Sequence, residues 1–114
     1  MANPSKIKGT RWESAVSKFL QGKGFPVWRM AQTGTEDQGD LGGLPEWAFE
    51  CRDRAKLELS KNVNDANARA QAKGALYGVT VMKKRNSSVG SAYVAMDLET
   101  FARILERIER KEHE

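Results

Sequence analysis

The sequence has few cysteine and histidine residues, whose thiol and imidazole groups often take part in catalysis and metal binding. Among its 114 residues it has one cysteine, Cys51, and one histidine, His113. A single cysteine forms no intramolecular disulfide, and these two residues cannot build a structural zinc site. Apart from His113 in the tail, there is no histidine to activate Cys51 as a nucleophile. Cysteine chemistry and zinc-stabilised folds are therefore excluded.

Long apolar runs are also missing. No stretch reaches membrane-spanning length, and the start, "MANPSKIKGTRWE", has no apolar segment of the kind found in secretory signals. Together with the scarcity of cysteine, this leads us to expect a cytoplasmic protein in a reducing compartment.

What remains is an ordinary globular composition with 39% hydrophobic and 30% charged residues. The length fits one domain, residues 1–114, in which we expect residues 1–8 and 110–114 to be flexible. A net charge of +4 and a pI near 9.4 favour a polyanionic partner such as nucleic acid, although small proteins without such a partner share this balance.

Periodicity and turn residues predict the order helix, strand, hairpin, helix, strand, strand, helix. This order indicates a mixed α/β fold, a small mixed sheet flanked by helices. The expected elements are a helix over 10–24, a strand over 25–31, a hairpin with strands near 40–41 and over 47–52, a helix over 60–76, strands over 79–85 and 92–98, and a C-terminal amphipathic helix on Leu98, Phe101, Leu105 and Ile108 with Asp97 as its N-cap.

The hairpin "GDLGGLPEWAFECRDR" places two carboxylates, Asp40 and Glu50, on either side of a turn. Side chains alternate along a strand, so Glu50 and Arg52 share one face while Phe49 and Cys51 share the other. We expect the second face to be core and the first to carry a site. Carboxylates facing each other across a hairpin attract a cation, and their hard oxygens suit Mg²⁺ or Mn²⁺, with Asp40 and Glu50 as the metal ligands.

With Glu13 on the first helix, Gly39–Asp40 before the turn and Glu50-Cys51-Arg52 after it, the sequence resembles the PD-(D/E)XK nuclease superfamily, and within it the Holliday junction resolvase-like proteins of archaea and phages. The resemblance runs from about Gly9 to Ile108. It implies a restriction-endonuclease-like core, Mg²⁺- or Mn²⁺-dependent cleavage of DNA, most often branched DNA, and a homodimer. In such a nuclease Asp40 and Glu50 bind the metal and Glu13 assists. A phage protein of this kind acts in the cytoplasm of its host.

The sequence departs from this pattern at Arg52, where the family usually has a lysine that orients water or stabilises the transition state. Arginine keeps the positive charge but cannot be deprotonated, so electrostatic stabilisation by Arg52 is possible and general base catalysis is not. The alternative is a catalytically weakened member that only binds nucleic acid. A binding module for an acidic partner, without a metal site, is a third hypothesis.

Several of these residues also have simpler interpretations. Thr10 and Glu13 form a capping-box pattern, Asp40 suits a turn, and Glu50 can pair with Arg52 on an exposed sheet face. Five cations are candidates for contacts with a phosphate backbone, with solvated surface charge as the alternative: Lys8, Arg11, Lys83, Lys84 and Arg85.

Overall fold

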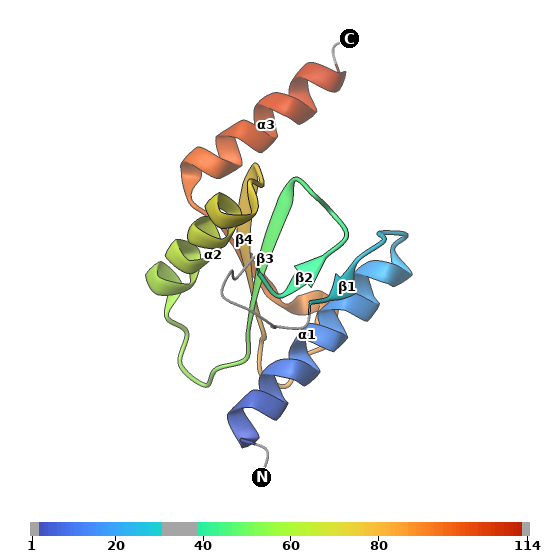
Figure 1. The fold of residues 1–114 in the computed structure, drawn as a ribbon, viewed down its shortest axis with the longest axis vertical. Coiled ribbons are helices and arrows are strands. Elements are labelled where there is room, and N and C mark those ends of the chain that lie inside the picture. Colours follow the sequence, from blue (N-terminus) through green and yellow to red (C-terminus); the bar gives the residue numbers. More distant parts are fainter. Residues whose placement is uncertain (1–2, 31–38, 113–114) are drawn as a thin grey trace.

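The computed structural model describes residues 3–30 and 39–112, which form a mixed α/β fold with three α-helices and a five-stranded sheet (Figure 1). The element order matches the order predicted from the sequence. The elements are α1 (Pro4–Gly22), β1 (Trp28–Arg29), β2 (Leu41–Gly42), β3 (Trp47–Arg52), α2 (Leu59–Lys73), β4 (Tyr77–Met82), the short 3₁₀ helix η1 (Val89–Ser91), β5 (Tyr93–Ala95) and α3 (Leu98–Glu112).

The strands follow one another across the sheet in sequence order, β1-β2-β3-β4-β5. Only the central pair, β3 and β4, is parallel, and α2 connects these two strands. The other pairs are antiparallel. A parallel pair needs a crossover connection, and the helix that provides it must cover a face of the sheet.

Helices cover both faces of β3, which corrects the expectation that one face of this strand is an open site. Phe49 and Cys51 pack with Trp12 and Val16 of α1 in the main hydrophobic core. The opposite face lies against α2, so that Ala48 is fully buried. Figure 1 shows the sheet between these two helices. Because β3 is buried on both sides, a site on it can open only at the end of the strand.

Gly78 shows how closely α2 lies against β4. A Cβ added at Gly78 would lie 2.4 Å from the carbonyl oxygen of Ala66, so any side chain there would force the helix away from the sheet. The buried stripe of α2 consists of Asn62, Ala66 and Ala70. Small residues on this stripe permit the close approach.

Helix α1 begins at Pro4, six residues earlier than expected, so residues 4–8 are helical rather than frayed. The Asn3 side chain caps the helix by accepting a hydrogen bond of 2.9 Å from the Ser5 N–H, and Pro4 suits the first turn. Thr10 is therefore in mid-helix, where its N–H is already used. This excludes the capping-box interpretation of Glu13.

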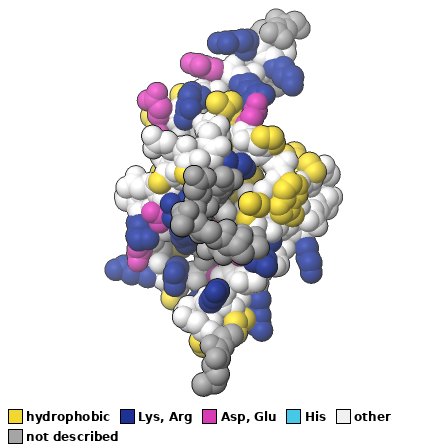
Figure 2. Space-filling view, in the orientation of Figure 1, with side chains coloured by type: hydrophobic (Ala, Val, Ile, Leu, Met, Phe, Trp, Pro, Cys, Tyr) yellow, Lys and Arg dark blue, Asp and Glu magenta, His cyan; other side chains and the backbone are white. Residues whose placement is uncertain are grey.

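Helix α3 is amphipathic as predicted, but it presents its apolar side to solvent within the described part of the chain. Leu98 is 79% exposed, whereas Thr100 is buried and Arg107 pairs with Glu46 in the turn before β3. Asp97 accepts a 2.6 Å hydrogen bond from the Thr100 hydroxyl at the start of the helix. Basic side chains gather on α3 at the top of Figure 2.

The C-terminal boundary also differs from the expectation. Residues 110–112 are the last turn of α3 rather than a loose tail, and residues 113–114 lie outside the described residues. Among the helices described, none combines the length and the apolar character needed to cross a membrane.

Candidate active site

The β2–β3 register brings the two hairpin carboxylates face to face, as the sequence predicted. Leu41 pairs with Phe49, and in an antiparallel ladder this pairing places Asp40 opposite Glu50. Both side chains are almost completely buried, with 3% of Asp40 and 2% of Glu50 exposed. Buried carboxylates are costly unless they are paired or hold a cation, so their partners decide what this site can do.

The backbone fixes Asp40 from both directions. Its own N–H donates to the Phe49 carbonyl at 2.8 Å, and the Cys51 N–H donates to Asp40 Oδ2 at 2.7 Å. The preceding Gly39 has a φ of 98°, and a Cβ there would lie 2.9 Å from the Phe49 carbonyl oxygen. Only glycine adopts this conformation without strain at such a close approach. Asp40 therefore occupies one defined position at the end of the sheet.

Arg52 lies between the carboxylates on the α2 side of the strand. Its guanidinium is 2.6 Å from Glu50 Oε2, 3.3 Å from Asp65 Oδ2 and 3.6 Å from Asp40 Oδ2. The other oxygen of Glu50 is 3.2 Å from Arg69 Nε on α2. The ion pair between Glu50 and Arg52 is therefore formed, but it is buried beneath α2 rather than on an exposed face.

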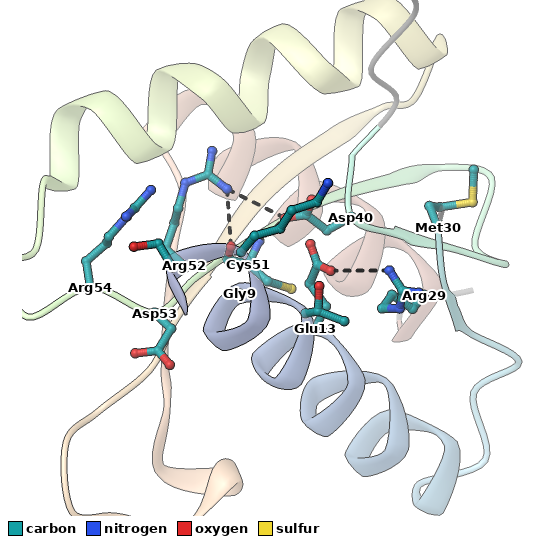
Figure 3. Close-up of a pocket in the computed structure, with 12 residues that line it drawn as sticks. Gly9, Glu13, Arg29, Met30, Asp40, Cys51, Arg52, Asp53 and Arg54 are labelled. Carbon is teal, nitrogen blue, oxygen red and sulfur yellow. Dashed lines mark hydrogen bonds and ion pairs between the residues drawn. The ribbon is translucent and has the colours of Figure 1, made fainter. Parts of the chain in front are cut away.

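Glu13 reaches the same site from α1. Its carboxylate is 3.8 Å from the Arg29 guanidinium, and Figure 3 shows this pair beside the pair of Asp40 and Arg52. Burial, followed by the nearby charge of Asp40 and a hydrogen bond with it, raises the pKa of Glu13 to about 7. We call Glu13, Asp40 and Glu50 the acidic cluster.

Two further groups have pKa values raised by burial and by the neighbouring carboxylates. Burial and then the charge of Asp40 raise the pKa of Glu50 to about 7, despite the partial compensation from Arg52. Burial, then Asp40, raises the pKa of the Cys51 thiol, which keeps it protonated and unreactive at neutral pH. Burial is the largest cause of both raised carboxyl pKa values, so the acidic cluster holds its negative charge at a desolvation cost that a divalent cation would relieve.

The donor chemistry of the cluster fits Mg²⁺ or Mn²⁺. Over residues 3–30 and 39–112, no three side chains of His, Cys, Asp or Glu are grouped closely enough to enclose a metal ion. Mg²⁺, however, is commonly held by one or two carboxylates together with water and substrate phosphate. Asp40, with Glu13 on one side and Glu50 on the other, provides such a partial set of ligands.

A cavity of about 500 Å³ opens beside the acidic cluster, at the end of β3. Glu13 and Asp40 contribute its acidic side, and Arg29 and Arg54 contribute positive charge (Figure 3). The lining residues are Ser5, Lys6, Gly9, Thr10, Glu13, Arg29, Met30, Asp40, Cys51, Arg52, Asp53 and Arg54.

Three of the five predicted phosphate-binding cations meet near this cavity. Lys8, Lys83 and Arg85 all form ion pairs with the buried carboxylate of Asp53. We call these three residues the cation cluster. Lys83 also lies over the Trp12 ring, with its Nζ 5.9 Å from the ring centroid.

The other two predicted cations lie elsewhere. Lys84, one position along from Lys83, points to the opposite side and lies over the Tyr93 ring at 5.9 Å. Arg11 is exposed on α1 and is not among the residues that line the cavity.

Sequence reasoning missed four residues of the site: Arg29, Asp53, Asp65 and Arg69. A signal existed for Asp53, because it continues the core-facing phase of Phe49 and Cys51, where a carboxylate is unexpected. Asp65 and Arg69 are one helical turn apart, which placed them on one face of α2 but did not say that this face meets β3.

Comparison with known proteins identifies no relative, since no family model, curated protein or solved structure matches this chain.

Proposed function

We propose that this protein is a metal-dependent endonuclease that hydrolyses phosphodiester bonds in DNA. The observation that carries the proposal is the position of Asp40, which the backbone holds between Glu13 and Glu50 at the edge of a cavity flanked by cations. Such an arrangement offers oxygen ligands for a metal beside positive charge for phosphate. The resemblance to PD-(D/E)XK nucleases assigns the same roles to the same positions.

Asp40 and Glu50 would hold the metal ion, and Glu13 would assist from α1. Bound there, Mg²⁺ or Mn²⁺ supplies an activated water and neutralises charge on the phosphate. Asp40 is oriented by the Cys51 N–H, so its lone pairs have a fixed direction before any ligand arrives. Arg52, already close to both carboxylates, is placed to stabilise developing negative charge.

Branched DNA and a homodimer complete the proposal. Both rest on the resemblance to Holliday junction resolvase-like proteins. A two-fold dimer would place two sites against two strands of a two-fold junction, which gives the pairing of substrate and assembly a geometric basis.

A second candidate function, nucleic-acid binding with little or no cleavage, is favoured by the position of Arg52. Its guanidinium lies 2.6 Å from Glu50 and 3.6 Å from Asp40, between the two carboxylates proposed to share a metal. If the contacts of Arg52 with these two carboxylates persist, its guanidinium takes the place of the metal ion. A weakened nuclease would keep the cation cluster and lose metal-dependent turnover.

Incubation with four-way junction, flap, duplex and single-stranded DNA separates these candidates, each substrate being tested with Mg²⁺, with Mn²⁺ and with EDTA. We expect cleavage of the junction with either metal and none with EDTA. Binding without cleavage under all conditions would support the second candidate. Neither binding nor cleavage would contradict both and favour a module for an acidic partner.

A further inference from the structure

The cation cluster is built around a single buried carboxylate. Asp53 follows β3 directly, and only 3% of its side chain is exposed. Lys8 Nζ lies 3.9 Å from Oδ1 and Lys83 Nζ lies 3.8 Å from Oδ2, while Arg85 forms an ion pair with Oδ1. Two segments that are distant in sequence, α1 and the chain just after β4, therefore bring positive charge to one point.

One carboxylate leaves this cluster with a positive excess. Asp53 is the only acidic residue with which any of the three cations forms an ion pair in the described part of the chain. The cationic side chains are 46%, 38% and 42% exposed for Lys8, Lys83 and Arg85, so each keeps donors directed away from Asp53. A salt bridge that served only to join α1 to the sheet would need one cation, not three.

We propose that Lys8, Lys83 and Arg85 together bind one phosphate group of the DNA strand, and that Asp53 is the positioning residue that gathers them. This inference rests on the proposed function, because it places the second phosphate next to the one that is cleaved. Asp53 is two residues beyond Cys51, whose N–H holds Asp40, and two extended residues span about 7 Å. Asp53 and Asp40 line the same cavity.

Phosphate suits this cluster better than a carboxylate ligand does. Two ammonium groups and one guanidinium present donors from different directions, and a tetrahedral phosphate has oxygens to meet each of them. Lys84 provides a natural contrast, since it lies beside these residues in sequence but over the Tyr93 ring. The run of basic residues in the sequence would include Lys84 in the phosphate site, whereas in the structure its side chain lies apart from the cation cluster.

The salt dependence of DNA binding, measured in EDTA by fluorescence anisotropy on duplex DNA, tests the number of phosphates bound. Each phosphate neutralised contributes about 0.9 to the slope of log affinity against log salt. Replacing all three cations by alanine should lower the slope by about 0.9, because they share one phosphate. Three independent backbone contacts would lower it by about 2.7. Lys84→Ala, the matched control, should leave the slope unchanged.

Asp53→Asn tests the positioning role through the coupling between two cations. With Asp53 present, Lys83→Ala and Arg85→Ala should be non-additive in binding free energy, because both serve the same phosphate. In the Asp53→Asn background the two losses should become additive, since nothing holds the cations together. A purely structural Asp53 would lower the melting temperature and leave this coupling unchanged. If Asp53→Asn does not fold, additive losses in the wild-type background would themselves contradict the shared site.

A slope loss near 2.7, no loss at all, or a Lys84→Ala effect as large as that of Lys83→Ala would overturn the inference. Its failure is distinguishable from failure of the proposed function, because binding is measured without metal. Cleavage with a slope loss of 2.7 would retain the nuclease and reject the shared phosphate site. A slope loss of 0.9 without cleavage of any substrate would retain the shared phosphate site and reject the nuclease.

Discussion

The acidic cluster and the cation cluster are similar in construction and opposite in charge. In the first, Glu13, Asp40 and Glu50 come from α1, the residue before β2, and β3, and burial raises the pKa values of both glutamates beside their arginine partners. In the second, cations from α1 and the end of β4 share the single carboxylate of Asp53. The first cluster holds carboxylates away from solvent, and the second holds three partly exposed cations around one buried carboxylate.

On the proposed function, the two clusters together would meet a ligand carrying both signs of charge. A metal ion would satisfy the acidic cluster, and a phosphate would satisfy the cation cluster. Neither cluster is efficient as a stabilising device, since buried ion pairs rarely repay the desolvation of their charges. Both are understandable if a metal-bound phosphodiester strand lies across the cavity.

The largest effect should come from removing the acidic side of the comparison. Asp40→Asn keeps the side-chain volume but loses the charge needed to hold a metal, so metal-dependent cleavage of a four-way junction should fall below detection. Glu50→Gln should behave alike. DNA binding in EDTA should persist for both variants, because the cation cluster is intact. Unchanged cleavage by either folded variant would remove that carboxylate from the site.

Arg52 is expected to have the next largest effect. Its loss should lower the single-turnover cleavage rate at saturating Mg²⁺ on the order of 10²-fold, the scale of one preorganised electrostatic donor. Arg52→Lys should retain or raise activity, because an ammonium at this position points to the same face and resembles the lysine that is usual in PD-(D/E)XK nucleases. Melting curves of the three proteins provide the control. A folded Arg52→Ala protein with full activity would rule out a catalytic role.

The pH dependence of stability should reveal the burial of the acidic cluster without any substrate. Glu13 and Glu50 have pKa values raised from 4.5 to about 7, so between these values the folded protein holds protons that the unfolded chain has lost. Their stabilising contribution is therefore present below pH 4.5 and is lost as the pH rises through about 7. The metal-free melting temperature should fall from pH 5 to pH 8.

Mg²⁺ should reverse this loss at pH 8 more than at pH 5, because the ligands must be deprotonated to bind it. Glu13→Gln should flatten the pH profile, since it removes one of the two titrating groups. Differential scanning fluorimetry across this pH range, with and without Mg²⁺, measures both effects. A metal-free melting temperature that rises with pH would contradict the raised pKa values of Glu13 and Glu50.

The smallest effect is expected at Asp65, which touches the acidic cluster only through Arg52. Its hydrogen bond with Lys61, the largest cause, lowers the pKa of this carboxyl, and Arg52 lies 3.3 Å away. Asp65 is partly exposed on α2, where ion pairs contribute little. Asp65→Asn should change the cleavage rate by only a few-fold. A loss as large as that of Arg52→Ala would mean that Asp65 orients the guanidinium.

Much of the fold and the centre of the site could be read from local sequence. The alternation around "WAFECR" and the turn residues between Asp40 and Glu50 predicted the hairpin register, because both signals act over a few residues. The helices followed from periodicity. Their ends were less accurate: Asn3 and Pro4 start α1 earlier than the apolar pattern suggested.

Contacts between distant segments were not readable in this way. The sequence could not say that Arg69 of α2 would lie against Glu50, or that Lys8 and Arg85 would meet at Asp53. The outward apolar side of α3, with Leu105 and Ile108 exposed, also contradicts what amphipathicity usually indicates. Each of these depends on how helices pack on the sheet.

By itself, then, the sequence determined the order of helices and strands, the pairing of Asp40 with Glu50, and the position of Arg52 on their face of β3. Only the tertiary structure decided that α2 closes this face and that the end of the strand opens into a cavity. The reason is that strand alternation and turn geometry are local properties of the chain. The balance of charge around each cluster is set instead by residues tens of positions apart, which meet only when the helices pack.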